Sequence, residues 1–325
     1  MLRKKHQRYR KDKLSVEHNG LWPYLVRYLH WLDVKGYSAN TGDVKDSRLR
    51  QFIQWCDERS LDDPRAITKP ILERYQRHLF YYQQPNGQPL AYSTQKMALS
   101  ALRSWFKWLT QENYLPSNPA SEVLPIKQPQ RLPERVLSVE DVHRILHSVN
   151  TDTLDGIRTR AIVEVLYSTG IRRLELCNLQ VYDVDPRRKS LFVRQGKGGK
   201  DRSLPIGQRA LDWVARYQEQ VRPKLLLNLQ ENHLFLSDYG EAYTTSLLGH
   251  TVKKVMLDNG IERGSCHLFR HAMATHMLEN GAELRYIQLM LGHANINTTT
   301  IYTHLSLTQL QHVHAITHPA EQPVT

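Results

Sequence analysis

Six basic or phenolic side chains stand in special local contexts of the sequence. One follows a Thr-Gly pair at a predicted helix end, one sits on a glycine-flanked turn, two lie three residues apart, and two flank the start of the last helix. In chain order they are Arg172, Lys197, His267, Arg270, His293 and Tyr302. Because residues three apart project from the same side of a helical turn, His267 and Arg270 are expected to face one site. Cationic groups beside a phenol suit a site that binds an anion and moves protons.

The charge balance favours one class of anionic ligand. Lys and Arg number 44 against 32 Asp and Glu, which gives a formal net charge of +12. Each phosphate that a basic protein neutralises releases condensed counterions, so a chain of this kind often binds nucleic acid. A soluble protein that is merely basic is the alternative that charge alone leaves open.

Several protein classes are disfavoured by the sequence. No stretch approaches the roughly 20 apolar residues that span a bilayer. The first residues, MLRKKHQRYRKDK, lack the apolar run of a secretory signal. Cys56, Cys177 and Cys266 lie far apart without CxxC spacing, so they are interpreted as reduced thiols. These observations favour a cytoplasmic protein with no membrane partner.

The N-terminal third is predicted to be a basic arm followed by a helical domain. Residues 1–20 carry seven Lys or Arg and form the arm, which either touches DNA phosphates or is a solvated tail. Residues 21–118 show helical periodicity. Their apolar stripes are Leu25, Val26, Leu29 and Leu32; Phe52, Ile53 and Cys56; Ile71, Leu72, Tyr75 and Leu79; and Met97, Ala101, Leu102, Trp105, Phe106 and Leu109. Thr68 is a plausible N-cap with Pro70 in the first turn, and the aromatic residues are expected in the core.

A proline-rich segment separates this domain from a second one. Five prolines lie within 116–135, and proline removes backbone donors and disfavours helix in the preceding residue. Residues 119–135 are therefore interpreted as the linker, and residues 136–325 as the second domain with a C-terminal tail.

The second domain is predicted to be mostly helical with a small sheet. Ser138 and Asp141 form a variant capping box, and a later helix stops at Gly170. Two β-type runs flank the glycine-rich turn within 190–206, which predicts a hairpin, and 233–237 is a candidate third strand. Further helices are expected around 244–258, 267–280, 283–291 and 297–312. The fold class is thus mainly α with a small antiparallel β-sheet, in two domains.

At this point the sequence resembles a family. YSTGIRRLEL (167–176), GKGGKDRSLPI (196–206), HLFRHAMATHMLENGAELRYIQLMLGH (267–293) and IYTH (301–304) look like the motifs of tyrosine recombinases, the Xer and integrase family. The resemblance covers nearly all of 136–310, in order and with the expected gaps. The helical region 21–118 matches the family's SAM-like core-binding domain in type and position, though more weakly.

The resemblance implies a chemistry that the residue types can carry. Breaking a DNA phosphodiester by in-line attack builds charge on its non-bridging oxygens, and Arg172 and Arg270 are assigned to clamp them. The family implies that Tyr302 attacks, giving a 3′-phosphotyrosyl link and a free 5′-hydroxyl. A phenol with an ordinary pKa near 10 needs a proton acceptor, and His267 is assigned to that role.

The remaining roles follow the family more directly. It places Lys197 as the proton donor to the departing 5′-oxygen and His293 as a hydrogen-bond donor to the phosphate. Glu175, one helical turn after Arg172, is expected to support the active-site arginine or histidine. Lys200 lies close enough to Lys197 to be confused with it, and Arg173 directly follows Arg172, although the position after Thr-Gly favours Arg172.

Neither a cofactor nor a metal is expected. His271 and His276 are five apart, so they do not share a helical face, and HExxH is absent. Both match family positions that pack or support the site. The phosphotyrosine would hold the phosphodiester energy, so that no ATP is required. The family implies a Holliday junction and double-stranded DNA as partner, with a homo-tetramer, or a hetero-tetramer with a related recombinase, on two DNA sites near the bacterial nucleoid. Accessory proteins are a further possibility.

Departures from the family pattern concern the subfamily. Cys266 replaces a common proline, Phe269 a common leucine, and Arg173 and Leu174 smaller residues. The basic arm and the loop 83–93 favour a mobile-element integrase slightly over chromosome-dimer resolution. After Tyr302, a short apolar stripe either docks into a neighbouring protomer, as in the family, or packs on its own domain. A type IB topoisomerase and a catalytically idle DNA-binding regulator are the rival functions.

Overall fold

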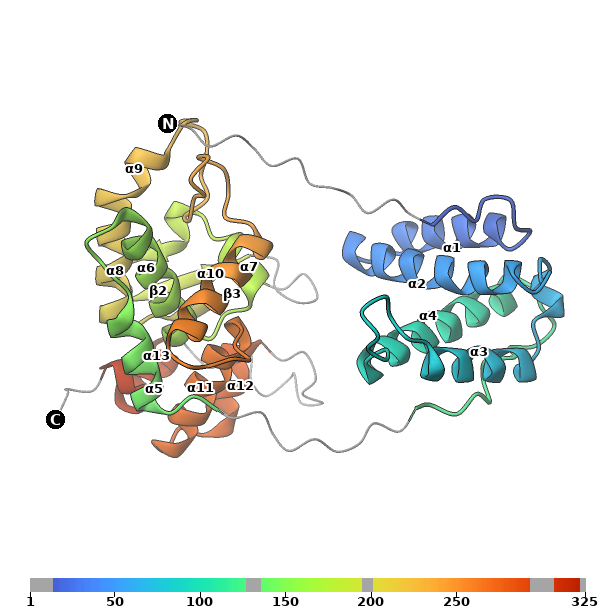
Figure 1. The fold of residues 1–325 in the computed structure, drawn as a ribbon. Coiled ribbons are helices and arrows are strands. Elements are labelled where there is room, and N and C mark those ends of the chain that lie inside the picture. The colour runs from blue at the N-terminus through green and yellow to red at the C-terminus, as the bar shows by residue number, and fades with distance from the viewer. Residues whose placement is uncertain (1–13, 127–135, 195–200, 293–306, 322–325) are drawn as a thin grey trace. The chain divides into compact units, whose positions relative to one another are not determined.

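The computed structural model describes residues 14–126, 136–194, 201–292 and 307–321 of the 325-residue chain (Figure 1). The chain divides into two compact units that meet in the sequence at the linker, the first comprising residues 14–126 and the second 136–321 of the described parts. Lys197, His293 and Tyr302 lie outside the described residues, as do the arm up to residue 13 and most of the linker.

The N-terminal unit is built from helices alone apart from an isolated bridge, within its described residues. Its helices, in chain order, are α1 (Trp22–Val34), α2 (Ala39–Asp57), η1 (Pro64–Ala66), α3 (Lys69–Tyr81) and α4 (Tyr92–Gln111). Ser38 caps α2 by accepting from the Thr41 amide, and Pro70 stands in the first turn of α3 as predicted. Thr68 holds the N-cap backbone position of α3 without a side-chain hydrogen bond.

Aromatic rings fill the core of this unit, as the sequence predicts. Phe52 of α2 contacts Tyr75 of α3 at 4.9 Å between ring centroids, and Trp105 and Phe106 of α4 within 6.4 Å. The predicted stripes are wrong at two positions, because Val26 and Met97 are exposed. In α1 the buried face runs through Tyr28, three residues after Leu25, and therefore passes Val26 by.

The C-terminal unit is mostly helical around a small sheet. Its helices are α5 (Val139–Ser148), α6 (Leu154–Thr169), α7 (Arg173–Cys177), η2 (Val181–Asp183), α8 (Gln208–Gln220), α9 (Arg222–Leu225), α10 (Thr245–Asp258), α11 (Cys266–Glu279), α12 (Leu284–Leu291), α13 (Leu307–Thr317) and η3 (Pro319–Glu321). The capping box of Ser138 and Asp141 at α5 is confirmed. Helices α8 and α9 are absent from the sequence prediction.

Within the described residues, the sheet has three antiparallel strands in sequential order. They are β1 (Val184–Asp185), β2 (Ser190–Val193) and β3 (Arg202–Pro205), and Val193 pairs with Arg202 at the base of the glycine-rich turn. The predicted hairpin is confirmed, but the third strand predicted at 233–237 is wrong. That segment makes only isolated bridges, and its apolar residues instead fill the core.

Helix α6 is the central element of this unit and ends where the candidate site begins. Every residue from Gly156 to Thr169 is buried, and α6 packs against α8 and α11. Gly170 ends it with φ of 60°, a left-handed conformation that glycine adopts without a steric penalty. A Cβ at Gly170 would stand 2.1 Å from the Met273 methyl of α11, so the turn is tight.

The C-terminal helix α13 packs on its own unit in this chain. Leu310 is buried, and two buried histidines bond to the last carbonyls of α6. Nε2 of His314 donates to the Ser168 oxygen at 2.8 Å, and Nε2 of His318 donates to the Tyr167 oxygen at 3.0 Å. Burial lowers the pKa of both imidazoles, so both stay neutral at neutral pH.

Across the described ranges, no helix combines the length and the apolar character that a bilayer crossing requires.

Candidate active site

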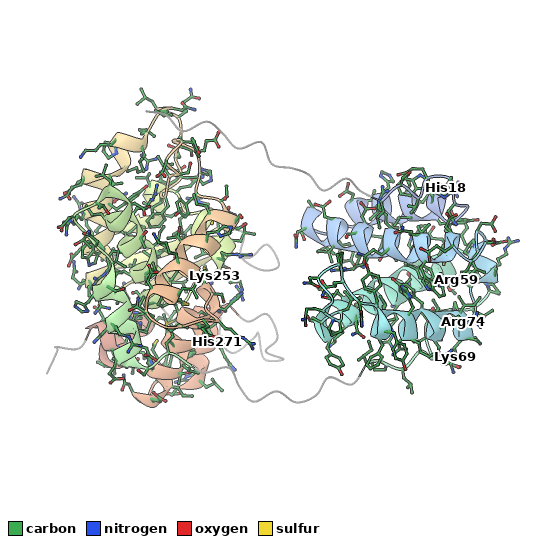
Figure 2. The ribbon with its side chains drawn as sticks, viewed as in Figure 1. His18, Arg59, Lys69, Arg74, Lys253 and His271 are labelled. Atoms are coloured by element: carbon green, nitrogen blue, oxygen red, sulfur yellow. The ribbon has the colours of Figure 1, made fainter. Side chains whose placement is uncertain are left out.

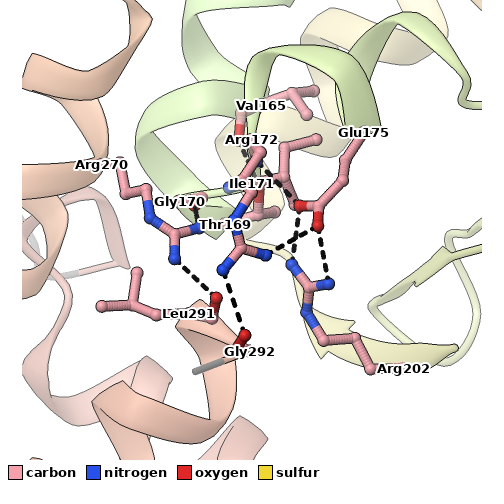
Figure 3. Close-up of polar contacts among 10 residues, drawn as sticks. All are labelled: Val165, Thr169, Gly170, Ile171, Arg172, Glu175, Arg202, Arg270, Leu291 and Gly292. Atoms are coloured by element: carbon pink, nitrogen blue, oxygen red, sulfur yellow. Dashed lines mark hydrogen bonds and ion pairs between the residues drawn. The ribbon is translucent and has the colours of Figure 1, made fainter. Parts of the chain in front are cut away.

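Arg172 and Arg270 are brought together at the C-terminal end of α12 (Figure 3). One terminal nitrogen of Arg270 donates to the Leu291 carbonyl at 2.6 Å, and one of Arg172 donates to the Gly292 carbonyl at 3.1 Å. The other terminal nitrogen of Arg270 donates to the Gly170 carbonyl at 2.6 Å, two residues before Arg172. The two guanidiniums therefore hold consecutive carbonyls of one helix end, which fixes both side chains relative to each other.

Glu175 holds Arg172 from the other side. Oε1 of Glu175 accepts from the Arg172 guanidinium at 2.9 Å, while Oε2 accepts from the Arg172 backbone amide at 2.8 Å. The second contact is part of the capping arrangement that begins the short helix α7. Of the two alternatives for Glu175, support of an arginine is the one that the geometry favours.

Arg202 of β3 completes this cluster and was missed by the sequence analysis. Its two terminal nitrogens donate to the two oxygens of Glu175 at 3.0 and 2.8 Å, a bidentate ion pair. Arg202 also lies against Gly292, where a Cβ would stand 3.1 Å from its guanidinium carbon. No local signal marks Arg202 in the sequence, since its partner is 27 residues away and the pairing depends on how β3 packs against α7.

The charges of this cluster act on one another. Burial alone would raise the pKa of Glu175, but the hydrogen bonds and charge of Arg202 and Arg172 outweigh it and lower the value to about 2. Burial lowers the pKa of Arg270 to about 10, helped by the like charges of Arg172 and Arg202. All four groups are charged at neutral pH, so the cluster holds three guanidiniums and one carboxylate. The site keeps a surplus of positive charge that suits an anion.

His267 stands in the first turn of α11, on the helix that carries Arg270. Its ring is exposed, and its pKa is lowered by partial burial and then by the positive charge of Arg270. A lowered pKa keeps the imidazole neutral at neutral pH, which is the form that can accept a proton.

The other two histidines of α11 differ from each other. His276 is buried, accepts from the Tyr167 hydroxyl through Nδ1 at 2.9 Å, and donates through Nε2 to the Leu137 carbonyl at 2.9 Å. This confirms a structural role for His276. His271 is exposed, so of the two expected roles, packing or support of the site, packing is wrong for it and support stays a prediction (Figure 2).

Arg173 does not share the cluster of Arg172. It is exposed, and its guanidinium lies toward α10, where a Cβ on Gly249 would stand 3.3 Å from it. The preference for Arg172 over Arg173 as the clamping residue agrees with this geometry. The described part of the chain contains no cluster of three or more His, Cys, Asp or Glu side chains that could hold a metal ion.

Comparison with known proteins gives the family. The model of the phage integrase family matches residues 135–309, and the model of the phage integrase N-terminal SAM-like domain matches residues 25–115. The chain is 49% identical to tyrosine recombinase XerC 2 of Ralstonia nicotianae over 306 residues, covering 94% of this chain and 88% of the relative. It is 38% identical to tyrosine recombinase XerD of Pseudomonas putida over 290 residues, covering 89% and 94%.

Solved structures share the fold. XerH recombinase bound to a palindromic difH substrate covers 94% of this chain and 97% of that one, with a TM-score of 0.68 at 18% identity. A lambda integrase dimer bound to a core site covers 85% and 95%, with a TM-score of 0.63 at 18% identity. The chain belongs to the phage integrase family of tyrosine recombinases. It is a site-specific DNA recombinase, with the Xer proteins among its relatives.

Proposed function

We propose that this enzyme cuts and rejoins double-stranded DNA through a 3′-phosphotyrosyl link on Tyr302 and a Holliday junction. The observation that carries the proposal is the pair Arg172 and Arg270, locked onto adjacent carbonyls with a surplus of positive charge. A phosphodiester under attack develops negative charge on its non-bridging oxygens, and guanidiniums already held in place stabilise that charge without reorganisation.

The roles of the other residues follow from their chemistry. Tyr302 attacks phosphorus, and its phenolic proton passes to the neutral imidazole of His267. The 5′-oxygen leaves as its bond to phosphorus breaks, and Lys197 supplies the proton that makes it a hydroxyl. His293, which follows Gly292 directly in the sequence, donates a hydrogen bond to the phosphate. Attack of another 5′-hydroxyl on the phosphotyrosine reverses these steps and rejoins the strands.

For the biological role we propose Xer-type recombination, which in this family serves chromosome-dimer resolution. The basic arm and the loop 83–93 slightly favoured a mobile-element integrase. The relatives support the other reading, because the two described above carry the names XerC 2 and XerD at 49% and 38% identity. The assembly that we propose is a homo-tetramer, or a hetero-tetramer with a related recombinase, on two DNA sites.

The test is a nicked duplex in which the 5′-hydroxyl is lost after cleavage, so that the covalent adduct accumulates. The wild type should form a protein–DNA adduct that persists in EDTA, and Tyr302→Phe should form none. Tyr182→Phe, at an exposed tyrosine of η2, is the matched control and should form the adduct normally. An adduct in Tyr302→Phe would refute the nucleophile.

A second assay separates strand exchange from topoisomerase-like relaxation. Two cognate sites incubated with the enzyme should yield junctions or recombinants. Relaxed plasmid without recombinants would instead favour the type IB topoisomerase alternative.

A further inference from the structure

Arg202 lies at the meeting point of three sequence motifs without being part of the proposed phosphate clamp. Both of its terminal nitrogens are committed to Glu175, and its side chain is only 15% exposed. Each terminal nitrogen keeps one further N–H, but the bidentate pair holds the guanidinium against Glu175 and the side chain is mostly buried. A direct contact between Arg202 and DNA is disfavoured by this arrangement.

The function of the pair becomes clear from the surroundings of Glu175. The carboxylate is only 6% exposed, and it makes four contacts, two with Arg202 and two with Arg172. A buried carboxylate that has lost one cationic partner pairs more strongly with the one that remains. Without Arg202, Glu175 would neutralise Arg172 and draw its guanidinium away from the phosphate.

The net charge of the cluster also depends on Arg202. The cluster has a net charge of +2, from the three guanidiniums of Arg172, Arg202 and Arg270 and the carboxylate of Glu175. A phosphodiester approaches a charge of about −2 as it is attacked, so the cluster matches the charge that it would stabilise. With Arg202 removed, only one positive charge would remain. The described residues offer Glu175 no third cation, since its ion pairs are with Arg172 and Arg202 alone.

We propose that Arg202 is a positioning residue that neutralises Glu175. The Arg172 guanidinium then keeps its positive charge, and its N–H groups that do not bind Glu175 remain available to the DNA phosphate. The inference rests on the proposed function of Arg172 as part of the clamp. Arg202 acts through Glu175 and touches neither DNA nor the nucleophile.

The experiment compares single and double variants by the single-turnover rate of adduct formation on the nicked duplex, in the full-length protein. Arg202→Met should slow adduct formation about 100-fold, the cost of displacing a catalytic group by about 1 Å. Arg202→Lys keeps the charge but loses the planar fork, so it should fall between Arg202→Met and the wild type. The matched control is Arg209→Met, which removes an arginine from the buried Glu164 at 2.9 Å outside this cluster and should cleave within about threefold of the wild type.

Restoration by a second substitution is the outcome that a merely structural role would not give. Glu175→Gln added to Arg202→Met removes the carboxylate that needs neutralising, so the double variant should recover at least tenfold over Arg202→Met. A double variant as slow as Arg202→Met, or slower, would overturn the inference, as would wild-type rates in Arg202→Met. If the wild type itself forms no adduct, the proposed function fails instead. If Arg202→Met does not fold, Arg202→Lys and its Glu175→Gln double variant decide the question in the same way.

Discussion

Two arginines, one in each unit, are buried to the same extent but have opposite kinds of partner. Arg50 of α2 and Arg270 of α11 are both 8% exposed. Arg50 is held by two carboxylates, Asp46 at 2.8 Å and Glu17 at 2.9 Å, and stacks on the Trp22 ring at 4.3 Å. Arg270 has only carbonyl oxygens as partners, and among the described residues no carboxylate lies within ion-pair distance of it.

The consequences for charge are also opposite. Burial disfavours the charged form of Arg50, but its two carboxylates more than compensate and raise its pKa. The pKa of Arg270 falls to about 10, because burial and the neighbouring Arg172 both act against the charge. A buried charge without a counter-ion costs stability. The C-terminal unit bears that cost at the site where, in the proposed mechanism, the DNA phosphate supplies the missing partner, whereas Arg50 in the N-terminal unit already has its carboxylates.

The largest predicted effect is on catalysis by Arg270→Met. Loss of a preorganised donor aimed at developing charge typically costs 100- to 1,000-fold, about 3–4 kcal/mol of barrier. We expect at least a 100-fold slower single-turnover cleavage of the nicked duplex. Cleavage within tenfold of the wild type would contradict the assignment of Arg270 to the clamp.

Arg50→Met should lower stability while leaving the cleavage rate nearly unchanged, and it serves as the control for Arg270→Met. It removes the ion pair between Arg50 and the Asp46 carboxylate, which is 3% exposed, and this costs about 3 kcal/mol of unfolding free energy. Urea unfolding followed by fluorescence measures this loss. Cleavage at saturating protein should stay within about threefold of the wild type. Equal stability losses in the two variants would remove the distinction between the two arginines.

The difference between the two units also explains how much could be predicted from the sequence. Periodicity predicted the helices of the N-terminal unit because its core is made of apolar and aromatic side chains, and it misplaced only single positions such as Val26 and Met97. Gly170 and the hairpin were predicted in the other unit because their turns require particular residues. The strand predicted at 233–237 was wrong because apolar runs do not distinguish strands from buried irregular chain.

The site was predictable only where a motif carried it. Arg172 and Arg270 come from the motifs, and the structure brings them together. Arg202 was missed because an arginine on a short strand looks like a solvated residue until its distant carboxylate is placed beside it. Helix α8 could have been predicted, because its buried residues Ala210, Leu211, Val214 and Tyr217 follow helical spacing; only its start gives no signal, since Gly207 has no side chain to cap it.

Glycine substitutions in the two units should have different effects on the cleavage rate, and these effects should be smaller than those of the arginine variants. Gly170→Ala places a side chain at φ of 60°, which costs about 1–2 kcal/mol, and pushes on Met273. Because the Gly170 carbonyl anchors Arg270, cleavage should slow about tenfold as the clamp shifts. Gly87→Ala, at φ of 74° with open space around it, has the same backbone cost in the N-terminal unit and should leave the cleavage rate unchanged. Identical rates for the two variants would contradict a tight link between this turn and the clamp.

The smallest effect concerns pH and the docking of α13. Burial is the largest cause that lowers the pKa of His314 and His318 below the ordinary 6.5. At His314 the charge of Glu321 opposes this shift. At His318 the charges of Arg209 and His276 add to it. The released helix takes up protons more readily than the docked one, so docking is at full strength above pH 6.5 and weakens as the pH falls below it. Between pH 7.5 and 5.5 the opening constant should rise by up to about tenfold for each histidine.

Amide hydrogen exchange of residues 307–321 at pH 7.5 and 5.5, corrected for the intrinsic pH dependence of exchange, measures this opening. The double variant His314→Gln/His318→Gln keeps an amide donor for the Ser168 and Tyr167 carbonyls but cannot titrate, so its protection should not change with pH. Amides of α1 in the N-terminal unit provide the internal reference, because no buried histidine holds that helix. Protection of α13 that is the same at both pH values in the wild type would show that these histidines remain neutral whether the helix is docked or released, and the contrast between the two units would then rest on the arginines alone.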